Sequence, residues 1–362
     1  MKLKVSRKEF IKAIQIAQRA ISPRSTIQIL EGILLKAKNN EIVLISSDTE
    51  ITIKTSIAAI VMEEGEIVVN SRLFGDIIRK FQGDTIDINL DGTSMNLKCE
   101  KSNFHIQCQL PDEYPMLPIV EKNNTFNISS QELSDSIKKT SFAVSMDETR
   151  MVFTGVLMDL SPAKINFVAL DGFRMALKTV NNPNENTTSA IIPARTLNEL
   201  IKVLENEDVN VCISRNMALF RTKTTEVYTT LLSGEFFKYQ GLITESHTTI
   251  CTISRVNLQS ALERASLLAK EDRANLVKFE IEEGFIKISS NSEIGNVEEI
   301  VESKVEGGNL KIAFNSKYLL DGIKIMESEE VRLYFTDSVN PCIIREDDED
   351  YLYLVLPVRL AK

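Results

Sequence analysis

Tryptophan is absent from this chain of 362 residues, and histidine and cysteine are scarce. The two histidines, His105 and His247, have no carboxylate or cysteine constellation near them in the sequence. The five cysteines are odd in number and scattered, and none forms a C-x-x-C pair. This usage is typical of reduced thiols in a cytoplasm. We therefore expect a cytoplasmic protein that has no metal site and no cofactor.

Long apolar runs and Gly-rich phosphate loops are missing as well. No run approaches the roughly 18 apolar residues of a membrane span. The first ten residues are strand-like and then charged, which is not the pattern of a signal peptide. No nucleophile–base pair is visible, so we expect no enzyme and no catalytic residues. A hydrolase using Asp171 or His105 is the alternative, but Asp171-Gly172 is more typical of a turn.

The overall charge is acidic, with a formal net charge of −9, which at first argues against a nucleic-acid partner. The chain is 43% hydrophobic and 26% charged, the composition of an ordinary soluble globular protein. Its length favours two or three domains.

A twelve-residue stretch occurs three times, at residues 70–81, 193–204 and 315–326, with starts 123 and 122 residues apart. In each copy, apolar residues follow the i, i+4, i+7 spacing of one helical face. They are Phe74, Ile78 and Phe81, then Leu197, Ile201 and Leu204, then Leu319, Ile323 and Met326. The stretch therefore predicts a helix that is repeated along the chain.

The repeat extends beyond this helix. A strand-to-helix step marked by Ser6, Ser129 and Ser254 begins each copy, and alternating β-branched runs follow it. The closing strands are expected at residues 104–109, 227–232 and 351–356. The sequence therefore predicts three α+β units, each with two helices and about eight strands, over residues 1–124, 125–248 and 249–362.

Bases recur at the third and tenth positions of each repeated stretch, on one helix face. A salt-bridge ladder is the plain interpretation, because Asp76, Glu199 and Asp321 lie between those bases. The charge partition favours a further role. The six expected helices, at residues 6–19, 70–81, 129–142, 193–204, 254–267 and 315–326, hold a net charge of +8, and the remainder holds −17. A surface that collects these helices attracts a polyanion.

The chain resembles the bacterial DNA polymerase III beta subunit, the replicative sliding clamp, over essentially its whole length. The motifs that carry the resemblance are Phe142-Ala143-Val144-Ser145, the segment 169–176, Ile191-Ile192-Pro193-Ala194, the segment 313–320, and the terminal Leu356-Pro357-Val358-Arg359-Leu360. The resemblance implies a head-to-tail homodimer closed into a ring around double-stranded DNA, with helices lining the pore and antiparallel sheets outside. It implies a processivity factor rather than a catalyst.

The bases expected to face DNA lie on the repeated helices and in the loop after the first of them. They are Arg24, Arg72, Arg79, Lys80, Lys138, Arg195, Lys202, Lys317 and Lys324. No aromatic residue is interleaved with them, which favours phosphate contacts without base readout. At roughly 10 Å per helix, twelve helices leave a hole of about 28 Å, wider than a duplex of roughly 20 Å.

The resemblance also implies a hydrophobic pocket for short motifs of the replicative polymerase, the clamp loader and repair proteins. Its expected residues are Phe153, Leu170, Gly172, Phe173, Arg174, Met175, Phe237, Leu242, Tyr318, Val339, Pro341, Leu354, Val355, Leu356, Pro357, Val358 and Arg359. Two positions depart from the family pattern. Phe237 replaces a proline at the pocket edge, and Phe173 replaces a histidine, so the pocket rim becomes more apolar.

Closure of the ring is expected to use the edge strand that carries Phe104 and Ile106. Leu267 and Leu268 of the other chain are expected to pack there, with Glu298 and Glu299 facing Lys98 and Lys101 by resemblance. The alternative is a repeat scaffold that binds only proteins and does not encircle DNA. The charge partition and the near-identical triplication argue against that alternative.

Overall fold

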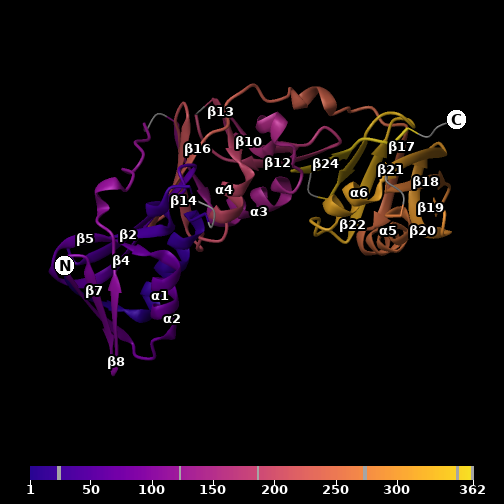
Figure 1. Ribbon diagram of the computed structural model, residues 1–362. Coiled ribbons are helices and arrows are strands. Elements are labelled where there is room, and N and C mark those ends of the chain that lie inside the picture. Colours follow the sequence, from indigo (N-terminus) through magenta and orange to yellow (C-terminus); the bar gives the residue numbers. More distant parts are fainter. Residues whose placement is uncertain (23–25, 122–123, 186, 272–274, 348–349, 360–362) are drawn as a thin grey trace. The chain divides into compact units, whose positions relative to one another are not determined.

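The computed structural model describes residues 1–22, 26–121, 124–185, 187–271, 275–347 and 350–359 (Figure 1). The chain divides into two compact units. The first consists of Met1–Leu133 and Arg195–Leu231, and the second of Ser134–Ala194 and Leu232–Lys362. The second predicted domain therefore contributes to both units. The domain boundaries near residues 124 and 248 stay a prediction.

One order of elements occurs three times in the described residues: strand, helix, four strands, helix, three strands. The first copy contains β1 (Lys2–Ser6), α1 (Arg7–Ala17), β2 (Gly32–Lys38), β3 (Glu41–Ser47), β4 (Ile51–Glu63), β5 (Gly65–Asn70), α2 (Ser71–Lys80), β6 (Thr85–Asp91), β7 (Ser94–Cys99) and β8 (Ser102–Gln107). The second contains β9 (Asn124–Ser129), α3 (Ser130–Ser141), β10 (Gly155–Ser161), β11 (Lys164–Leu170), β12 (Arg174–Asn181), β13 (Thr188–Pro193), α4 (Ala194–Leu200), β14 (Asp208–Ile213), β15 (Met217–Arg221) and β16 (Thr225–Thr230).

The third copy contains β17 (Thr249–Ser254), α5 (Arg255–Ala269), β18 (Leu276–Glu282), β19 (Phe285–Ser292), β20 (Gly295–Gly307), β21 (Leu310–Asn315), α6 (Ser316–Ile323), β22 (Glu330–Phe335), β23 (Cys342–Arg345) and β24 (Tyr351–Val355). Short 3-10 helices lie in the connections: η1 (Gln18–Ala20), η2 (Gln28–Glu31), η3 (Pro111–Glu113), η4 (Glu148–Thr154) and η5 (Tyr239–Leu242). The predicted α+β class, with two helices and eight strands in each copy, is confirmed.

Each unit contains one large antiparallel sheet. In the first unit the strands follow the order β8-β7-β6-β1-β4-β16-β15-β14-β9, with β2, β3 and β5 branching from β4. In the second unit the order is β13-β10-β11-β12-β24-β23-β22-β17-β20-β19-β18-β21. The sheets thus join strands of successive repeats, through β4 with β16 and through β12 with β24.

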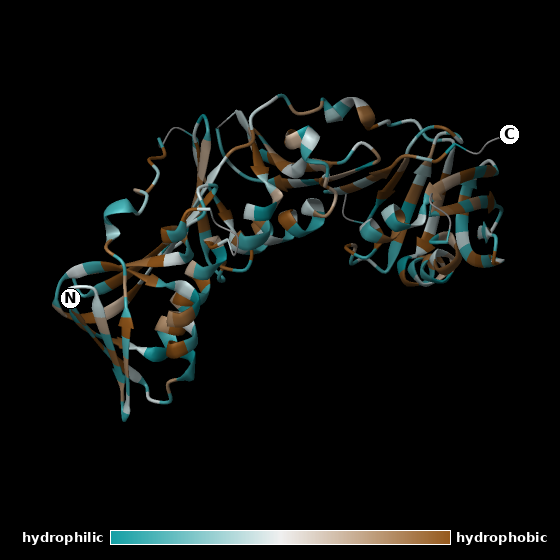
Figure 2. Ribbon diagram, in the orientation of Figure 1, coloured by the Kyte–Doolittle hydropathy of each residue, from teal (hydrophilic) through white to brown (hydrophobic). Residues whose placement is uncertain are grey.

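The apolar spacing of the repeated stretch produces the expected buried helix face. In α2, Phe74, Ile77 and Ile78 are buried, and Phe74 packs edge-on against Phe10 of α1 at 5.5 Å between ring centroids. The helix begins where the Asn70 side chain accepts a hydrogen bond from the Leu73 amide. Apolar residues concentrate along the strands and on the covered helix sides, and hydrophilic residues in the turns (Figure 2).

Two helices are shorter than their apolar pattern predicts. Helix α4 ends at Leu200 and α6 at Ile323, and hydrogen-bonded turns continue each of them for a few residues. Strand β8 likewise ends at Gln107, and Gln109 forms an isolated bridge with Val68. All five cysteines are free and buried. In the described part of the chain, no helix is long and apolar enough to cross a membrane.

Candidate partner pocket and DNA-facing helices

One cluster of apolar side chains in the second unit gathers several of the predicted pocket residues. Its buried members are Leu157, Val168, Leu170, Met175, Ile191, Tyr239, Ile343, Leu352 and Leu354. Its half-buried members are Val152, Phe153, Leu177, Leu232, Phe236, Leu242, Ile243, Tyr334 and Leu356. Six predicted residues therefore meet in this apolar cluster: Phe153, Leu170, Met175, Leu242, Leu354 and Leu356.

Burial separates the floor of the cluster from its accessible rim. Leu170, Met175 and Leu354 are buried and form the floor, whereas Phe153, Leu242 and Leu356 keep part of their surface exposed. Val355 is fully buried in β24, between β12 and β23, and the alternation of a strand points it and Leu354 to opposite faces. Its place in the pocket stays a prediction.

The turn between β11 and β12 sets the position of the next pocket residues. A side-chain oxygen of Asp171 accepts hydrogen bonds from the amides of Phe173 and Arg174, at 2.9 and 3.1 Å. Gly172 has a φ of +92°, a left-handed conformation that side chains disfavour. The turn interpretation of Asp171-Gly172 is confirmed, and the turn leaves Phe173 57% exposed.

Arg174 is buried at the centre of a polar network. Its guanidinium pairs with Asp171 at 3.0 Å and with Asp321 at 2.6 Å, and it donates to the Phe142 carbonyl at 3.2 Å. Burial lowers the pKa of Arg174, but the interactions with Tyr353 and then Asp321 together raise it by more, so the net shift of the pKa is upward. The contacts of the Arg174 guanidinium are thus made within the chain, where they hold together the elements around the proposed pocket.

Two rings and the C-terminal segment lie above this network. Phe173 stacks on Tyr318 at 5.9 Å, and the Arg174 guanidinium lies 4.7 Å from the centre of the Tyr318 ring. The Leu356 amide donates to the Phe173 carbonyl at 2.8 Å. The Val358 amide donates to Ala313, also at 2.8 Å. The apolar end of the chain is therefore held by main-chain hydrogen bonds, with Pro357 and Val358 half-buried and Arg359 exposed.

Three further predicted pocket residues belong neither to this cluster nor to the contacts around Arg174 and the C-terminal segment. Phe237 is 48% exposed in the segment after β16, and Val339 and Pro341 lie in the connection from β22 to β23. The Val339 amide donates to Asp337 at 2.8 Å. Their membership of the pocket stays a prediction.

Sequence reasoning missed the neighbours of Phe237 that do enter the cluster. Phe236 packs edge-on against Phe153 at 5.8 Å. The Tyr239 hydroxyl donates to Asp159 at 2.8 Å, and burial followed by this bond raises the pKa of Tyr239 to about 12. The three-residue spacing of Phe236 and Tyr239 is the signal in the sequence that could have indicated them.

The predicted DNA-facing bases are exposed wherever the structure describes them. Exposed side chains are found at Arg72, Arg79, Lys80, Lys138, Arg195, Lys202, Lys317 and Lys324. Arg24 lies outside the described residues. Within the described ranges, Arg72, Lys80, Lys138 and Lys317 form no ion pair, so these four are free to meet phosphates.

The other four bases are paired, but only partly as a salt-bridge ladder. Arg79 pairs with Asp76, and Lys202 with Glu199 at 2.7 Å, as that interpretation predicts. Asp321, however, bonds to Arg174 instead of Lys317 or Lys324. Lys324 pairs with Glu263 at 3.1 Å, and Arg195 with Asp48 at 2.5 Å. The exposed pair of Arg79 with Asp76 contributes about 0–1 kcal/mol and can be exchanged for phosphate, whereas the Asp48 side chain that binds Arg195 is buried.

The residues predicted for ring closure lie on open surfaces of their own units. Strand β8 is the edge of the first sheet, where Phe104 is 41% exposed and packs edge-on against Phe81. Ile106 and Leu268 are half-buried, and Leu267 is 67% exposed. Glu298 and Glu299 are already paired within the chain, with Lys287 at 3.0 Å and Arg264 at 2.6 Å. The sequence did not predict those two partners.

Three repeats of one α+β unit, with antiparallel sheets that continue from repeat to repeat, define a clamp-type architecture. Family models of the DNA polymerase III beta subunit match nearly the whole chain: the N-terminal domain at residues 1–118, the central domain at 127–238 and the C-terminal domain at 240–359. The chain belongs to the DNA polymerase III beta subunit family.

Relatives with assigned names support this membership. A beta sliding clamp of Staphylococcus epidermidis is 35% identical over 374 residues, covering 99% of this chain and 99% of the relative. A beta sliding clamp of Bacillus subtilis is 33% identical over 376 residues, covering 99% and 100%. The crystal structure of the Bacillus subtilis sliding clamp superposes with a TM-score of 0.96 at 32% identity, covering both chains completely.

Proposed function

We propose that this chain is a DNA sliding clamp. Two copies close head-to-tail into a ring that encircles double-stranded DNA without sequence specificity in the cytoplasm. The ring tethers the replicative polymerase, the clamp loader and repair proteins through the apolar cluster of the second unit. It is a processivity factor with no catalytic residues of its own.

One observation supports ring closure: successive repeats join within the chain by the same rule. The last strand of a repeat pairs antiparallel with a strand of the preceding repeat, the third of the four strands between its two helices. These pairs are β16 with β4, and β24 with β12. Applied once more, the rule pairs β8 with β20 of another copy. Both edges are available, since β8 ends its sheet and the Gly295–Glu299 part of β20 pairs only with β19 in the described structure.

The same rule fixes the register of this pairing. Val227 lies opposite Ile53 at the first junction, and Tyr353 lies opposite Ala176 at the second. The pairings within the hairpins show which positions of the repeats are equivalent. Phe104 is equivalent to Val227 and Tyr353, and Val297 is equivalent to Ile53 and Ala176. Val227 and Tyr353 are buried, whereas Phe104 is 41% exposed in the single chain. We infer that Phe104 is buried opposite Val297 of the partner copy.

A contact beside the β12–β24 pairing indicates which side chain of the partner copy should pack on Phe104. Phe142, just after α3, packs against Tyr353 at 5.5 Å between ring centroids. Because Ser129 and Ser254 begin equivalent helices 125 residues apart, Leu267 occupies the place of Phe142. Leu267 is therefore expected to pack on Phe104 of the other copy, which accounts for its large exposure in the single chain.

A closed ring stays on the DNA because it surrounds the duplex, so its retention does not depend on how strongly any residue contacts the DNA. The exposed bases are long, single side chains that can meet phosphates without reading bases. A ring held in this way slides along the duplex. The apolar cluster, with its buried floor and half-buried rim, suits a few hydrophobic anchors of an extended peptide. A sliding clamp of Pseudomonas aeruginosa, 25% identical to this chain, has been crystallised bound to griselimycin.

A disulfide across the seam tests the closure on which this function depends. Phe104→Cys combined with Val297→Cys places two thiols on one face of an antiparallel pair, at a separation a disulfide can bridge. We expect a covalent dimer under mild oxidation. His105→Cys combined with Val297→Cys is the control, because a slip of one residue points the thiols to opposite faces. Equal cross-linking of both variants, or of neither, contradicts the register.

A further inference from the structure

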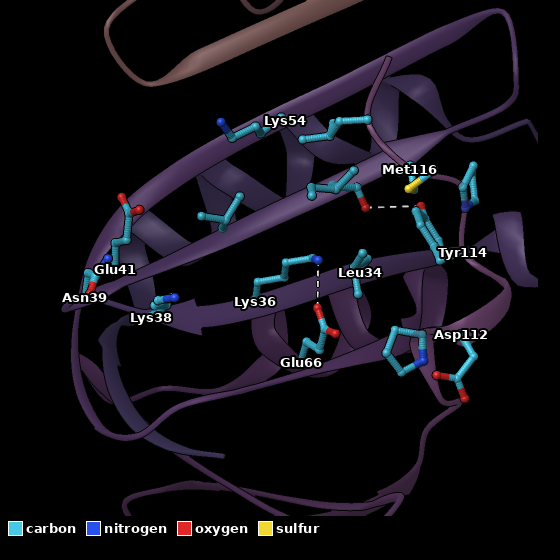
Figure 3. A pocket seen from close by; sticks show the side chains of 15 residues that line it. Leu34, Lys36, Lys38, Asn39, Glu41, Lys54, Glu66, Asp112, Tyr114 and Met116 are labelled. Carbon is cyan, nitrogen blue, oxygen red and sulfur yellow. Dashed lines mark hydrogen bonds and ion pairs between the residues drawn. The ribbon is translucent and has the colours of Figure 1, made fainter. Parts of the chain in front are cut away.

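A cavity of about 540 Å³ lies on the first unit, remote in sequence from the apolar cluster described above. Its floor is the surface of β2 and β3, and one wall is the connecting segment after η3 (Figure 3). The Tyr114 hydroxyl fastens that segment to the sheet by donating toward the Gly32 and Ile45 carbonyls, at 3.2 and 3.1 Å. Cavities of about 300–1,000 Å³ are the size of ligand and peptide sites.

A small apolar cluster of the first unit, whose members Leu34, Ile45, Tyr114 and Leu117 line the cavity, occupies the same positions of the repeat as the apolar cluster of the second unit. A constant offset of 123 residues relates Leu30 to Phe153, Leu34 to Leu157, Ile45 to Val168 and Val68 to Ile191, and all eight residues belong to the two clusters. The strand pairings obey the same offset, because Leu34 pairs with Ile45 as Leu157 pairs with Val168. With an offset of 122, Tyr114 and Leu117 correspond to Phe236 and Tyr239.

The cavity has the length and shape of an extended peptide. Leu34, Lys36 and Lys38 alternate along one face of β2, and the stretch from Leu34 to Lys38 spans about 13 Å at roughly 3.3 Å per residue. The apolar side chains Leu34, Tyr114 and Met116 lie toward the connecting segment, and Lys38 lies toward the opposite end (Figure 3). Met116, at the rim, is 93% exposed. An apolar anchor therefore has its place at the end next to the connecting segment.

Charge distinguishes this groove from its counterpart and indicates what it binds. Lys36 pairs with Glu66 at 2.7 Å, and Lys54 with Glu226 at 3.1 Å, so these cations are neutralised. Lys38 lies opposite Glu41 across the β2–β3 hairpin. At the apolar end, Asp112 forms no ion pair among the described residues, and exposed Glu113 follows it. In the counterpart, Gly234 occupies the place of Asp112 by the offset of 122.

We propose that the first unit carries a second peptide-docking groove, for an extended segment in which an apolar anchor is followed by lysine or arginine. The anchor packs on Leu34, Tyr114 and Met116, and the base meets Asp112. This inference rests on the proposed peptide-binding role of the apolar cluster, because the groove is its equivalent in the repeat. The two sites differ in charge, so a ring presents two kinds of docking site on each chain.

Binding of a defined probe tests the groove on the full-length protein. The probe is acetyl-Ser-Leu-Phe-Lys-Arg amide carrying a benzophenone on the Phe ring, and its counterpart has Glu in place of both bases. We expect cross-links to the segments 34–45 and 111–117. Met116→Ser with Asp112→Asn lowers the affinity for the basic probe by at least about tenfold, since anchors and their charge partners dominate such contacts.

Matched controls keep the two sites apart. Ile119→Ser with Asp91→Asn changes similarly exposed side chains outside the groove and leaves probe binding unchanged. Deleting residues 357–362 removes the proposed partner pocket and also leaves probe binding unchanged. Loss of probe binding in that deletion, equal affinity in the groove variant, or preference for the Glu counterpart each overturns the groove. Loss of probe binding in the deletion would show that the probe occupies the apolar cluster, whereas the other two results leave the ligand of that cluster untouched.

Discussion

The guanidinium of Arg174 lies 2.6 Å from a carboxylate oxygen of Asp321, and this ion pair joins β12 to α6. Asp321 lies on the same helix as Lys317, one of the bases predicted to face DNA, yet its carboxylate pairs with Arg174 of the pocket region. The pair is buried on the Arg174 side, beneath the stacked Phe173 and Tyr318 rings. It therefore supports one wall of the proposed partner pocket.

Replacing Arg174 by Met should destabilise the protein and loosen that wall. Removing one partner of a buried ion pair costs about 3–5 kcal/mol, because Asp171 and Asp321 lose their counter-charge. Arg174→Lys keeps the charge but cannot reproduce the fork of contacts to Asp171, Asp321 and Phe142. Urea unfolding should rank wild type above the Lys variant and the Lys variant above the Met variant. Equal stability of all three contradicts the supporting role.

A second buried pair predicts how stability depends on pH. Glu346 lies 3.2 Å from Lys139 and accepts hydrogen bonds from the Ser328 and Glu327 amides. Burial raises the pKa of Glu346, but the two amides and Lys139 together lower it by more, so the net shift of the pKa is downward. A lowered folded-state pKa stabilises the protein above the unfolded value of about 4.3, and this stabilisation is lost as pH falls through the folded-state pKa.

Glu346→Gln should therefore cost about 3–5 kcal/mol at pH 7, and the cost should shrink below about pH 4.3. Urea unfolding at both pH values measures this difference. Glu283→Gln, at an exposed position, is the control and should change little at either pH. A penalty for Glu346→Gln that is the same at both pH values would show that its ionisation does not stabilise the fold.

Replacing both Leu267 and Leu268 by Ala should yield monomers that remain folded. Leu267 is 67% exposed in the single chain, so its truncation leaves the core of the unit intact. Truncating two leucines that become buried in the dimer costs about 4–10 kcal/mol of association free energy. Analytical ultracentrifugation over a dilution series measures it, with Val256→Ala, exposed on the same helix, as the control. A double variant as dimeric as wild type refutes the assignment.

Deleting residues 357–362 should abolish binding of a Gln-Leu-x-Leu-Phe-type peptide while the ring stays dimeric. Strand β24 ends at Val355, and the Leu356 amide still has Phe173 as its acceptor, so the sheet keeps its pairing. Calorimetry measures peptide binding, and sedimentation measures the dimer. Arg359→Ala, at an exposed position, is a milder variant that should lower the affinity only partly. Equal affinity of full-length and truncated rings would place the pocket elsewhere.

Local patterns were sufficient to predict the repeated elements. The apolar residues of 70–81 face the core as their spacing requires, and Asn70 caps the helix with its own side chain. The strand predicted for residues 41–46 likewise corresponds to β3. These features depend on neighbours within a turn or a strand, so the sequence alone contains them.

Side-chain partners were the part that the sequence could not provide. Asp321 was expected to pair along its own helix, but Arg174, 147 residues away in the chain, lies closer to it. Glu299 pairs with Arg264, a partner that the sequence did not predict, and its role at the seam stays a prediction. Phe236 packs on Phe153, a contact that the sequence did not predict either. Each choice depends on long-range packing that local periodicity does not specify.

Retention on circular against linear DNA tests the central claim most directly. The protein is loaded by its clamp loader onto a nicked circular plasmid and passed through a sizing column, and half of the sample is linearised first. The account predicts stable retention on the circle, even at high salt, and rapid loss from the linear form, because the ring slides off free ends. Equal retention on both forms, or loss from both with rising salt, would show that contacts and not encirclement hold the DNA.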